Sequence, residues 1–229
     1  TSSAMTMSMS MSRRRSVKAW LRAASAALLA LVALSSAGEA AAADPASDPI
    51  FGLAIAIARD DKGERIVDDA WVQRQIDDAN GFFAPLGTRF RWTIEKPLPE
   101  PHGELHTRAN RDALTPLTEK NMIDVFVVRA LEDVDEPGRY RMGVCWTGRG
   151  GKRFIVIART ARPTVLAHEL GHFFGNRQHS TVVNNLMSYS RDGGTVFLDE
   201  RQARTIQRFT TSFLETGRLI DVGPPRRVR

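Results

Sequence analysis

The stretch AHELGHFFGNRQHS, residues 167–180, holds three of the five histidines in this 229-residue chain. His168 and His172 are four positions apart, so on a helix they lie on one face, about one turn from each other. Two imidazoles placed in this way reach the same zinc ion at about 2.0–2.1 Å each. Glu169 would lie beside the metal without binding it, where it can take a proton from metal-bound water.

The residues around this pair predict a helix over 163–174. Pro163 suits a first helical turn, and Gly175 suits a helix exit that needs positive φ. The opposite face of the helix is apolar and is expected to pack in the core through Leu166, Leu170 and Phe173. A catalytic zinc site needs three protein ligands as well as water. The chain can double back after Gly175 and bring His179 to the metal.

The order of these residues resembles the metzincin clan of zinc metalloproteases. The pattern of that clan is HExxHxxGxxH with a downstream Met-turn, and here residues 168–175 are followed by His179 and by Leu186-Met187-Ser188-Tyr189. HExxH together with the glycine and the Met-turn, in this order, is a specific signal. The resemblance implies an α+β, zincin/metzincin-like fold: a mixed twisted sheet with an antiparallel edge strand, an active-site helix and a C-terminal helix.

The resemblance also implies a role for each matching residue. Glu169 is similar to the general base of the clan, and Met187 to the residue that forms an apolar floor beneath the metal. Tyr189 is similar to the Met-turn tyrosine, which touches the metal or stabilises the oxyanion. The zinc ligands implied by the resemblance are His168, His172 and His179.

One departure from the clan pattern concerns the third ligand. Gln178 occupies the position where the third histidine is expected, and His179 comes one residue later. A turn absorbs one extra residue, so His179 is the favoured ligand. The rival is Glu200, at the start of the last predicted helix, which would give the arrangement of the gluzincins.

The hydrophobic pattern outside this stretch predicts alternating strands and helices. The glycine-rich segment 148–151 lies between two strand-like runs and indicates a hairpin. Strands with helices between them and one late hairpin favour a mixed sheet covered by helices. The predicted strands are 51–58, 90–95, 122–128, 142–146 and 153–158, and the other predicted helices are 66–83 and 199–216.

The first 43 residues have the composition of a secretory signal peptide. Five basic residues within 13–22 precede an apolar run over 23–34, and small residues follow up to Ala43. The apolar run has about 12 residues, whereas a membrane-spanning helix needs about 20. We therefore expect residues 44–229 to be released as a secreted or periplasmic protein without a stable membrane anchor.

The net charge of the chain lies mainly in this leader. The leader holds five basic residues and one acidic residue, which leaves +2 of the formal +6 for residues 44–229. So small an excess argues against nucleic acid as a partner. The basic tail over 223–229 is expected to be flexible.

The length of 44–229 fits a single catalytic domain. One cysteine, Cys145, excludes an internal disulfide and is predicted to be a buried, inert thiol. His102 and His106 are also four apart, but their Pro- and Gly-rich surroundings predict a solvated loop, with a second metal site or a substrate contact as the alternative. The sequence does not indicate the number of subunits.

Together these patterns predict a secreted zinc metalloendopeptidase that acts on peptides or proteins. In this interpretation zinc lowers the pKa of its bound water to about 7, and Glu169 removes the proton. The hairpin over 142–158 would supply an edge strand that holds extended substrate. The alternatives are a zinc-stabilised binding or inhibitory protein without catalysis, and a gluzincin-type peptidase with Glu200 as the third ligand.

Overall fold

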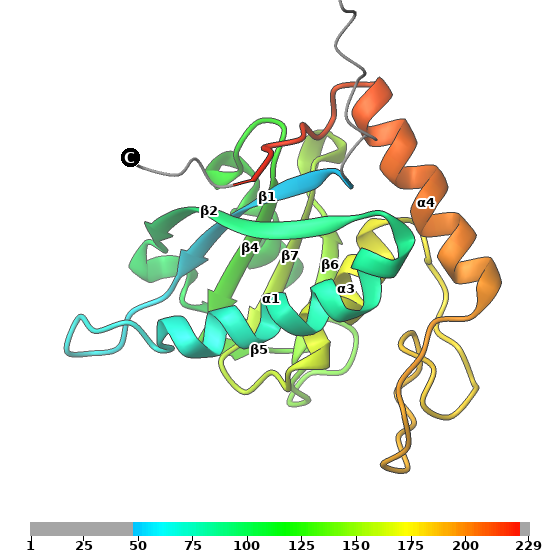
Figure 1. The fold of residues 1–229 in the computed structure, drawn as a ribbon. Coiled ribbons are helices and arrows are strands. Elements are labelled where there is room, and N and C mark those ends of the chain that lie inside the picture. The colour runs from blue at the N-terminus through cyan, green and yellow to red at the C-terminus, as the bar shows by residue number, and fades with distance from the viewer. Residues whose placement is uncertain (1–47, 225–229) are drawn as a thin grey trace, which may run out of the picture. The chain divides into compact units, whose positions relative to one another are not determined.

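The fold is built around a five-stranded sheet (Figure 1). The computed structural model describes residues 48–224, so the predicted leader and the last five residues of the tail lie outside the described part. The strands lie in the order β2-β1-β4-β7-β6; the first four are parallel, and β6 is antiparallel to β7. Their bounds are β1 Ile50–Ile57, β2 Arg89–Pro97, β4 Ile123–Val128, β6 Gly143–Thr147 and β7 Arg153–Ala158.

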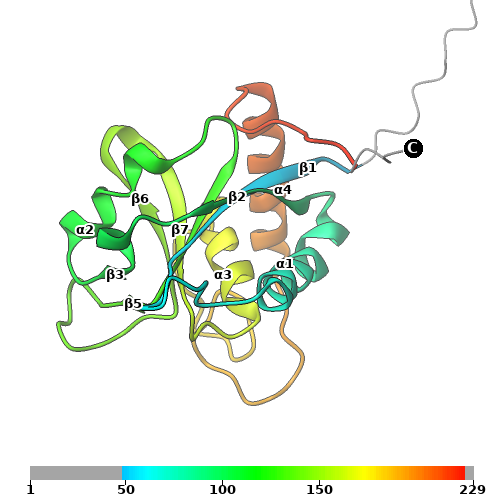
Figure 2. The same ribbon diagram turned by 90° about the vertical axis from the view of Figure 1, so that its left-hand side faces the viewer.

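The helices divide between the two faces of the sheet (Figure 2). On one side lie α1 (Asp69–Phe83), α3 (Thr164–Phe173) and α4 (Glu200–Glu215). On the other lies the short α2 (Arg108–Asp112) with the small β3–β5 pair, Glu104–Leu105 and Ala130–Leu131. Single 3-10 turns complete the fold at Ala84–Leu86, Glu100–His102, Thr115–Leu117 and Arg149–Gly151.

Alternation along the central strands explains why both faces are covered. Successive side chains of a strand point to opposite faces, and in β1 Ile55 and Ile57 pack with the residues of α1 and α3, whereas Ala56 faces the other layer. The whole of β4 is buried for the same reason. Parallel strands are buried on both faces, and this burial is the main stabilising contribution.

The predicted fold class is confirmed: the sheet is mostly parallel, its last strand is antiparallel, and helices cover it. Each predicted strand and long helix is present, with small shifts at the ends. The helix predicted from residue 66 begins at Asp69, because the Asp68 side chain accepts a hydrogen bond from the Trp71 amide and caps it there. The β3–β5 pair was not predicted, because strands of two residues leave no periodic pattern in the sequence.

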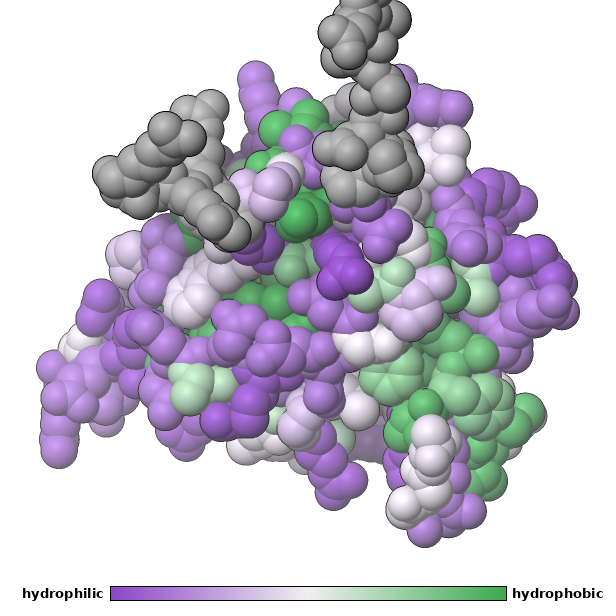
Figure 3. All heavy atoms as spheres, in the orientation of Figure 1, coloured by the Kyte–Doolittle hydropathy of each residue, from purple (hydrophilic) through white to green (hydrophobic). Residues whose placement is uncertain are grey.

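None of the helices in 48–224 combines the length and the apolar character needed to cross a membrane. The face seen in Figure 3 is mostly hydrophilic, and its largest group of apolar side chains lies at the lower right, where the loop between α3 and α4 runs in Figure 1. That loop exposes Val182, Val183 and Phe197.

The exit of α3 fixes the direction of this loop. Gly175 has φ +96°, and its amide donates to the His172 carbonyl at 3.0 Å, while the Asn176 amide donates to the Gly171 carbonyl at 3.0 Å. This pair of hydrogen bonds is the Schellman motif, which ends a helix at a left-handed residue. A Cβ on Gly175 would lie 2.3 Å from the Phe209 ring of α4, so glycine is required here for both backbone and packing reasons.

Gly175→Ala should therefore destabilise the protein more than Gly193→Ala. Both residues have positive φ, +96° and +91°, but a Cβ added to Gly193 would have no neighbour within 4 Å. Gly193→Ala should lower the free energy of unfolding by about 1–2 kcal/mol from backbone strain alone, and Gly175→Ala by a further 1–3 kcal/mol, roughly, from the contact with Phe209. Urea denaturation measures both values, and equal losses would contradict the packing role of Phe209.

Candidate metal centre

Helix α3 presents the first two histidines on one face. His168 and His172 lie one turn apart, and their ring centroids are 4.8 Å from each other. The opposite face is anchored in the core as predicted, through the fully or nearly fully buried Leu166, Leu170 and Phe173. The helix thus directs two imidazoles away from the sheet while its own position is fixed by apolar contacts.

The structure brings His179 to the same point. The loop that leaves the Schellman turn places His179 Nε2 3.1 Å from His172 Nε2, and His168 Nε2 is also 3.1 Å from His172 Nε2. One ligand atom from each of the three rings lies within 4.8 Å of those of the other two. This is the only such group of metal-ligating side chains within residues 48–224.

Backbone carbonyls set the protonation state of two of these rings. Nδ1 of His168 lies 2.7 Å from the Leu186 carbonyl oxygen, and Nδ1 of His172 lies 2.7 Å from that of Asn176. A carbonyl only accepts hydrogen bonds, so we assign the ring proton to Nδ1 in both residues. Both Nε2 atoms then carry a lone pair, and metal-binding histidines commonly have this arrangement.

The geometry of these nitrogens fits a zinc ion. Neither His168 Nε2 nor His172 Nε2 carries a hydrogen, so their 3.1 Å contact is not a hydrogen bond and is repulsive unless a cation lies between them. Two nitrogens bound to one tetrahedral zinc at about 2.05 Å lie about 3.3 Å apart. The donor set, three neutral imidazoles, is also one that zinc prefers.

Burial keeps the imidazoles neutral. It lowers the pKa of His168 and of His172 to about 4 in each case, and it lowers the pKa of His179 in the same direction. Metal binding requires the unprotonated ring. At neutral pH these nitrogens therefore need to lose no proton before they bind a cation.

Glu169 lies beside the triad and is almost completely buried, with 5% of its surface exposed. Burial raises the pKa of its carboxyl to about 8, against the lowering effect of a hydrogen bond from the backbone of Cys145. The residue opposite is Gly143 at the start of β6, where a Cβ would lie 2.8 Å from Glu169 Oε1. A divalent cation held by the imidazoles would favour the ionised carboxylate, because opposite charges attract.

The segment with the predicted Met-turn packs directly beneath α3. Met187 is fully buried, and a Cβ on Gly171 would lie 2.4 Å from its sulfur. Gly171 therefore lets the methionine approach the helix backbone between His168 and His172. The preceding residue, Leu186, provides the carbonyl that orients His168.

Tyr189 covers the triad from the solvent side. Its ring centroid is 4.2 Å from that of His179 and 5.7 Å from that of His168. The side chain is nevertheless 67% exposed. Burial of the part that faces the histidines raises the pKa of its hydroxyl, so the group remains a hydrogen-bond donor at neutral pH.

Other candidates from the sequence lie away from the triad. The Glu200 side chain is 87% exposed and pairs with Arg204 at 3.1 Å on the first turn of α4. His106 lies 2.8 Å from a Glu132 oxygen, and neither it nor His102 belongs to a metal-ligating group within the described residues. Cys145 lies in β6 as predicted, and burial raises the pKa of its thiol.

Sequence reasoning missed the residues that support the ligands. Arg191 donates to the Leu186 and Ser188 carbonyls and so holds the Met-containing turn. Asn185, in the same turn, exchanges two side-chain hydrogen bonds with Gln202 of α4 at 2.9 and 3.0 Å. The capping box of α4, Asp199 with Gln202, was readable as a helix start, but its link to the turn depends on tertiary contact.

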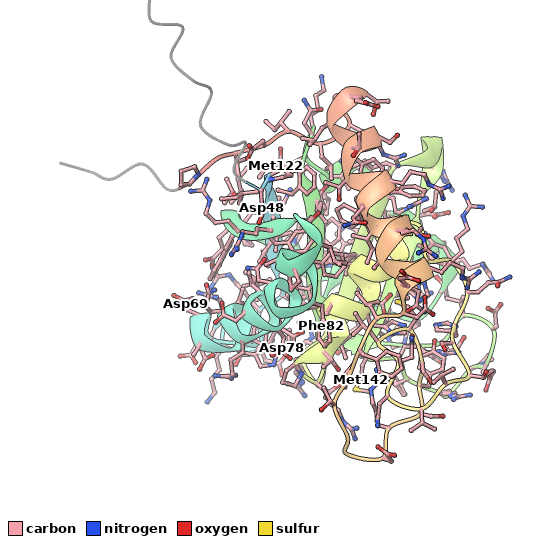
Figure 4. The ribbon with its side chains drawn as sticks, turned by 45° about the vertical axis from the view of Figure 1, so that its right-hand side comes forward. Asp48, Asp69, Asp78, Phe82, Met122 and Met142 are labelled. Atoms are coloured by element: carbon pink, nitrogen blue, oxygen red, sulfur yellow. The ribbon has the colours of Figure 1, made fainter. Side chains whose placement is uncertain are left out.

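Two cavities flank the triad. One, of about 560 Å³, lies on the side of His172 and His179; the other, of about 330 Å³, lies on the side of His168. Glu169 and Tyr189 line both. Met142, which lines the second cavity, is seen near the lower end of α3 in Figure 4. The histidine triad therefore lies between two cavities.

Comparison with known proteins adds information at the level of fold. No protein-family model matches the sequence, and no curated protein matches it. Among solved structures, the chain is similar to metalloproteinase-II from Bacteroides fragilis, with 12% identity and a TM-score of 0.51 over 71% of this chain and 53% of that one. It is also similar to archaemetzincin from Methanopyrus kandleri, with 20% identity and a TM-score of 0.48 over 74% and 99%.

The likeness to the Bacteroides protein shows that the chain shares the fold of a metalloproteinase. The chain spans about half of the length of the Bacteroides protein. Fold alone does not imply activity, so a function must follow from the histidine triad and its surroundings.

The buried carboxyl gives a pH-dependent prediction for protein kept in a metal chelator. The pKa of Glu169 is about 8 in the folded chain, against an ordinary value of 4.5, so between these values folding favours the protonated form and the contribution of Glu169 to stability falls as pH rises. Gln at this position does not titrate. Glu169→Gln should therefore gain free energy of unfolding relative to wild type from pH 5 to pH 8, by at most about 1.4 kcal/mol per pH unit.

Urea denaturation at pH 5, 6.5 and 8 measures this difference. The histidines titrate in both proteins, so their contribution cancels to a first approximation. A difference that stays constant over this range would contradict the burial of an ionisable carboxyl at residue 169.

Proposed function

We propose that this chain is a secreted zinc-dependent endopeptidase of metzincin type. The observation that carries the proposal is the convergence of three imidazole nitrogens, with 3.1 Å between neighbours, beside a buried carboxyl group. The metalloproteinase fold supports it. Export rests on the composition of residues 1–43, which lie outside the described part.

The number of protein ligands in the triad fits a catalytic zinc site better than a structural one. Structural zinc sites are normally closed by four protein ligands, whereas catalytic sites have three and keep one position open. Within the described residues the group consists of three histidines, and both cavities reach it. This arrangement favours catalysis over a purely stabilising zinc, and it favours His179 over Glu200 as the third ligand.

Glu169 is the proton carrier of the proposed reaction. A zinc ion bound to the triad would supply Lewis acidity to the peptide carbonyl and to the attacking water. The Glu169 carboxylate takes the proton of the attacking water and then gives it to the nitrogen of the leaving amine. Only 5% of the Glu169 surface is exposed, so the carboxylate has little contact with bulk water during this transfer.

Tyr189 is the proposed oxyanion donor. Its ring lies over His179 and its side chain faces both cavities. The hydroxyl remains protonated at neutral pH, so it can donate a hydrogen bond to the carbonyl oxygen as negative charge develops there.

Strand β6 is the proposed docking edge for substrate. It is the last strand of the sheet, so it pairs with β7 on one side and presents its other edge to the cavities. An extended peptide would add to this edge through main-chain hydrogen bonds. Such docking favours unfolded peptides and flexible loops as substrates.

Glu169→Gln tests the peptidase directly. The variant keeps the three imidazoles and should bind zinc as wild type does, but its hydrolysis of a mixed peptide library should fall by at least about 100-fold, since general acid–base catalysis typically contributes this much. Glu200→Gln is the matched control and should cleave like wild type. Equal cleavage by Glu169→Gln and wild type, at equal zinc content, would favour a zinc-stabilised binding protein.

A further inference from the structure

The lining of the two cavities is strongly basic. Five arginines line the larger cavity and four line the smaller one; Arg141 is common to both, so the total is eight. The acidic residues that line them are three: Asp133, Asp135 and Glu169. No lysine contributes, and guanidinium groups suit carboxylates better than ammonium groups do because they form two parallel hydrogen bonds.

The two cavities together are called the cleft below, and the positive charge of the protein is concentrated there. Residues 44–229 carry a formal excess of only +2, whereas the cavity lining alone has an excess of +5. The remainder of that segment is therefore negative by three charges. A positive cleft that is surrounded by a remainder of opposite sign concentrates its field on ligands that enter the cleft.

Internal pairing accounts for only part of the basic lining. Arg108 pairs with Asp135, Arg139 with Glu136 and Arg141 with Asp133. The other five arginines have no carboxylate within 4.0 Å in the described part of the chain. Three of these five stabilise the fold instead, because their side chains donate hydrogen bonds to backbone carbonyls: Arg111, Arg153 and Arg191.

Arg162 and Arg177 remain, and they lie on opposite sides of the metal centre. Arg162 precedes α3 and lines the smaller cavity, while Arg177 follows α3 and lines the larger one. Both are exposed, and within residues 48–224 neither side chain makes a hydrogen bond or an ion pair. Their guanidinium groups are therefore available to a ligand that spans the cleft past Glu169.

We propose that the cleft selects peptides with Asp or Glu on both sides of the cleaved bond, and that Arg162 and Arg177 determine this specificity. The inference rests on the proposed peptidase function, because it assumes an extended peptide along β6. An anionic side chain on each side of the bond gains a guanidinium partner, and neither arginine contributes to the core. Both are specificity residues and take no part in proton transfer.

The test compares three matched peptides with the zinc-loaded full chain at low ionic strength. They share one sequence and differ only at the positions flanking the bond, which are Glu, Gln or Lys. The Glu peptide should have a kcat/KM at least about fivefold above that of the Gln peptide, and the Lys peptide the lowest value. The preference should weaken as salt rises, because screening reduces interactions between exposed charges.

Charge reversal identifies the responsible arginines. Arg162→Glu and Arg177→Glu should each reduce the preference for Glu, and the double variant should favour the Lys peptide. Arg74→Glu makes the same charge change on the exposed face of α1, away from the cavities, and should keep the wild-type preference. Equal loss in Arg74→Glu, or no preference in wild type, would overturn the assignment.

A binding measurement separates this inference from the proposed function. Fluorescence anisotropy of the labelled Glu and Gln peptides on Glu169→Gln protein reports recognition without cleavage. Stronger binding of the Glu peptide supports the inference even if wild type cleaves nothing, in which case the peptidase proposal fails alone. Cleavage without discrimination overturns the inference alone. Displacement of the Glu peptide by a DNA oligonucleotide of equal charge at lower concentration would also overturn it.

Discussion

The close approach of three neutral imidazole nitrogens is the constraint on which the site depends. Lone pairs 3.1 Å apart repel, so the fold must hold His168 and His172 in place by other means. The carbonyls of Leu186 and Asn176 do this by accepting the Nδ1 hydrogens. One carbonyl belongs to the turn beneath the helix and the other to the helix exit, so both ends of the arrangement must form before the site exists.

The sheet and its helices serve to fix those two segments. Buried strands anchor α3 through its apolar face, and the contact between Gly175 and Phe209 of α4 sets the exit of the helix. Gln202, also in α4, holds the turn that contains Met187 through Asn185. Helix α4 therefore stabilises the metal centre without contributing a ligand. Precise metal sites depend on this kind of supporting shell.

Local periodicity was sufficient to predict the strands, the long helices and the positions of His168, Glu169 and His172, because four-residue spacing on a helix determines which side chains share a face. The positive φ of Gly175 was also predictable from its place at the helix end. The Leu186 carbonyl that accepts from His168, the close approach of Gly143 to Glu169 and the basic cleft were not. Each depends on residues distant in sequence, and periodicity carries no information about such contacts.

Zinc content measured by plasma mass spectrometry tests the central claim most directly. Full-length wild-type protein, dialysed against a weak chelator, should retain one zinc per chain, and Glu200→Ala should retain the same amount. His179→Ala should lose most of it, since the remaining two imidazoles bind zinc weakly. The contrary result, with zinc retained in His179→Ala and lost in Glu200→Ala, would show that the three imidazoles do not form the metal site.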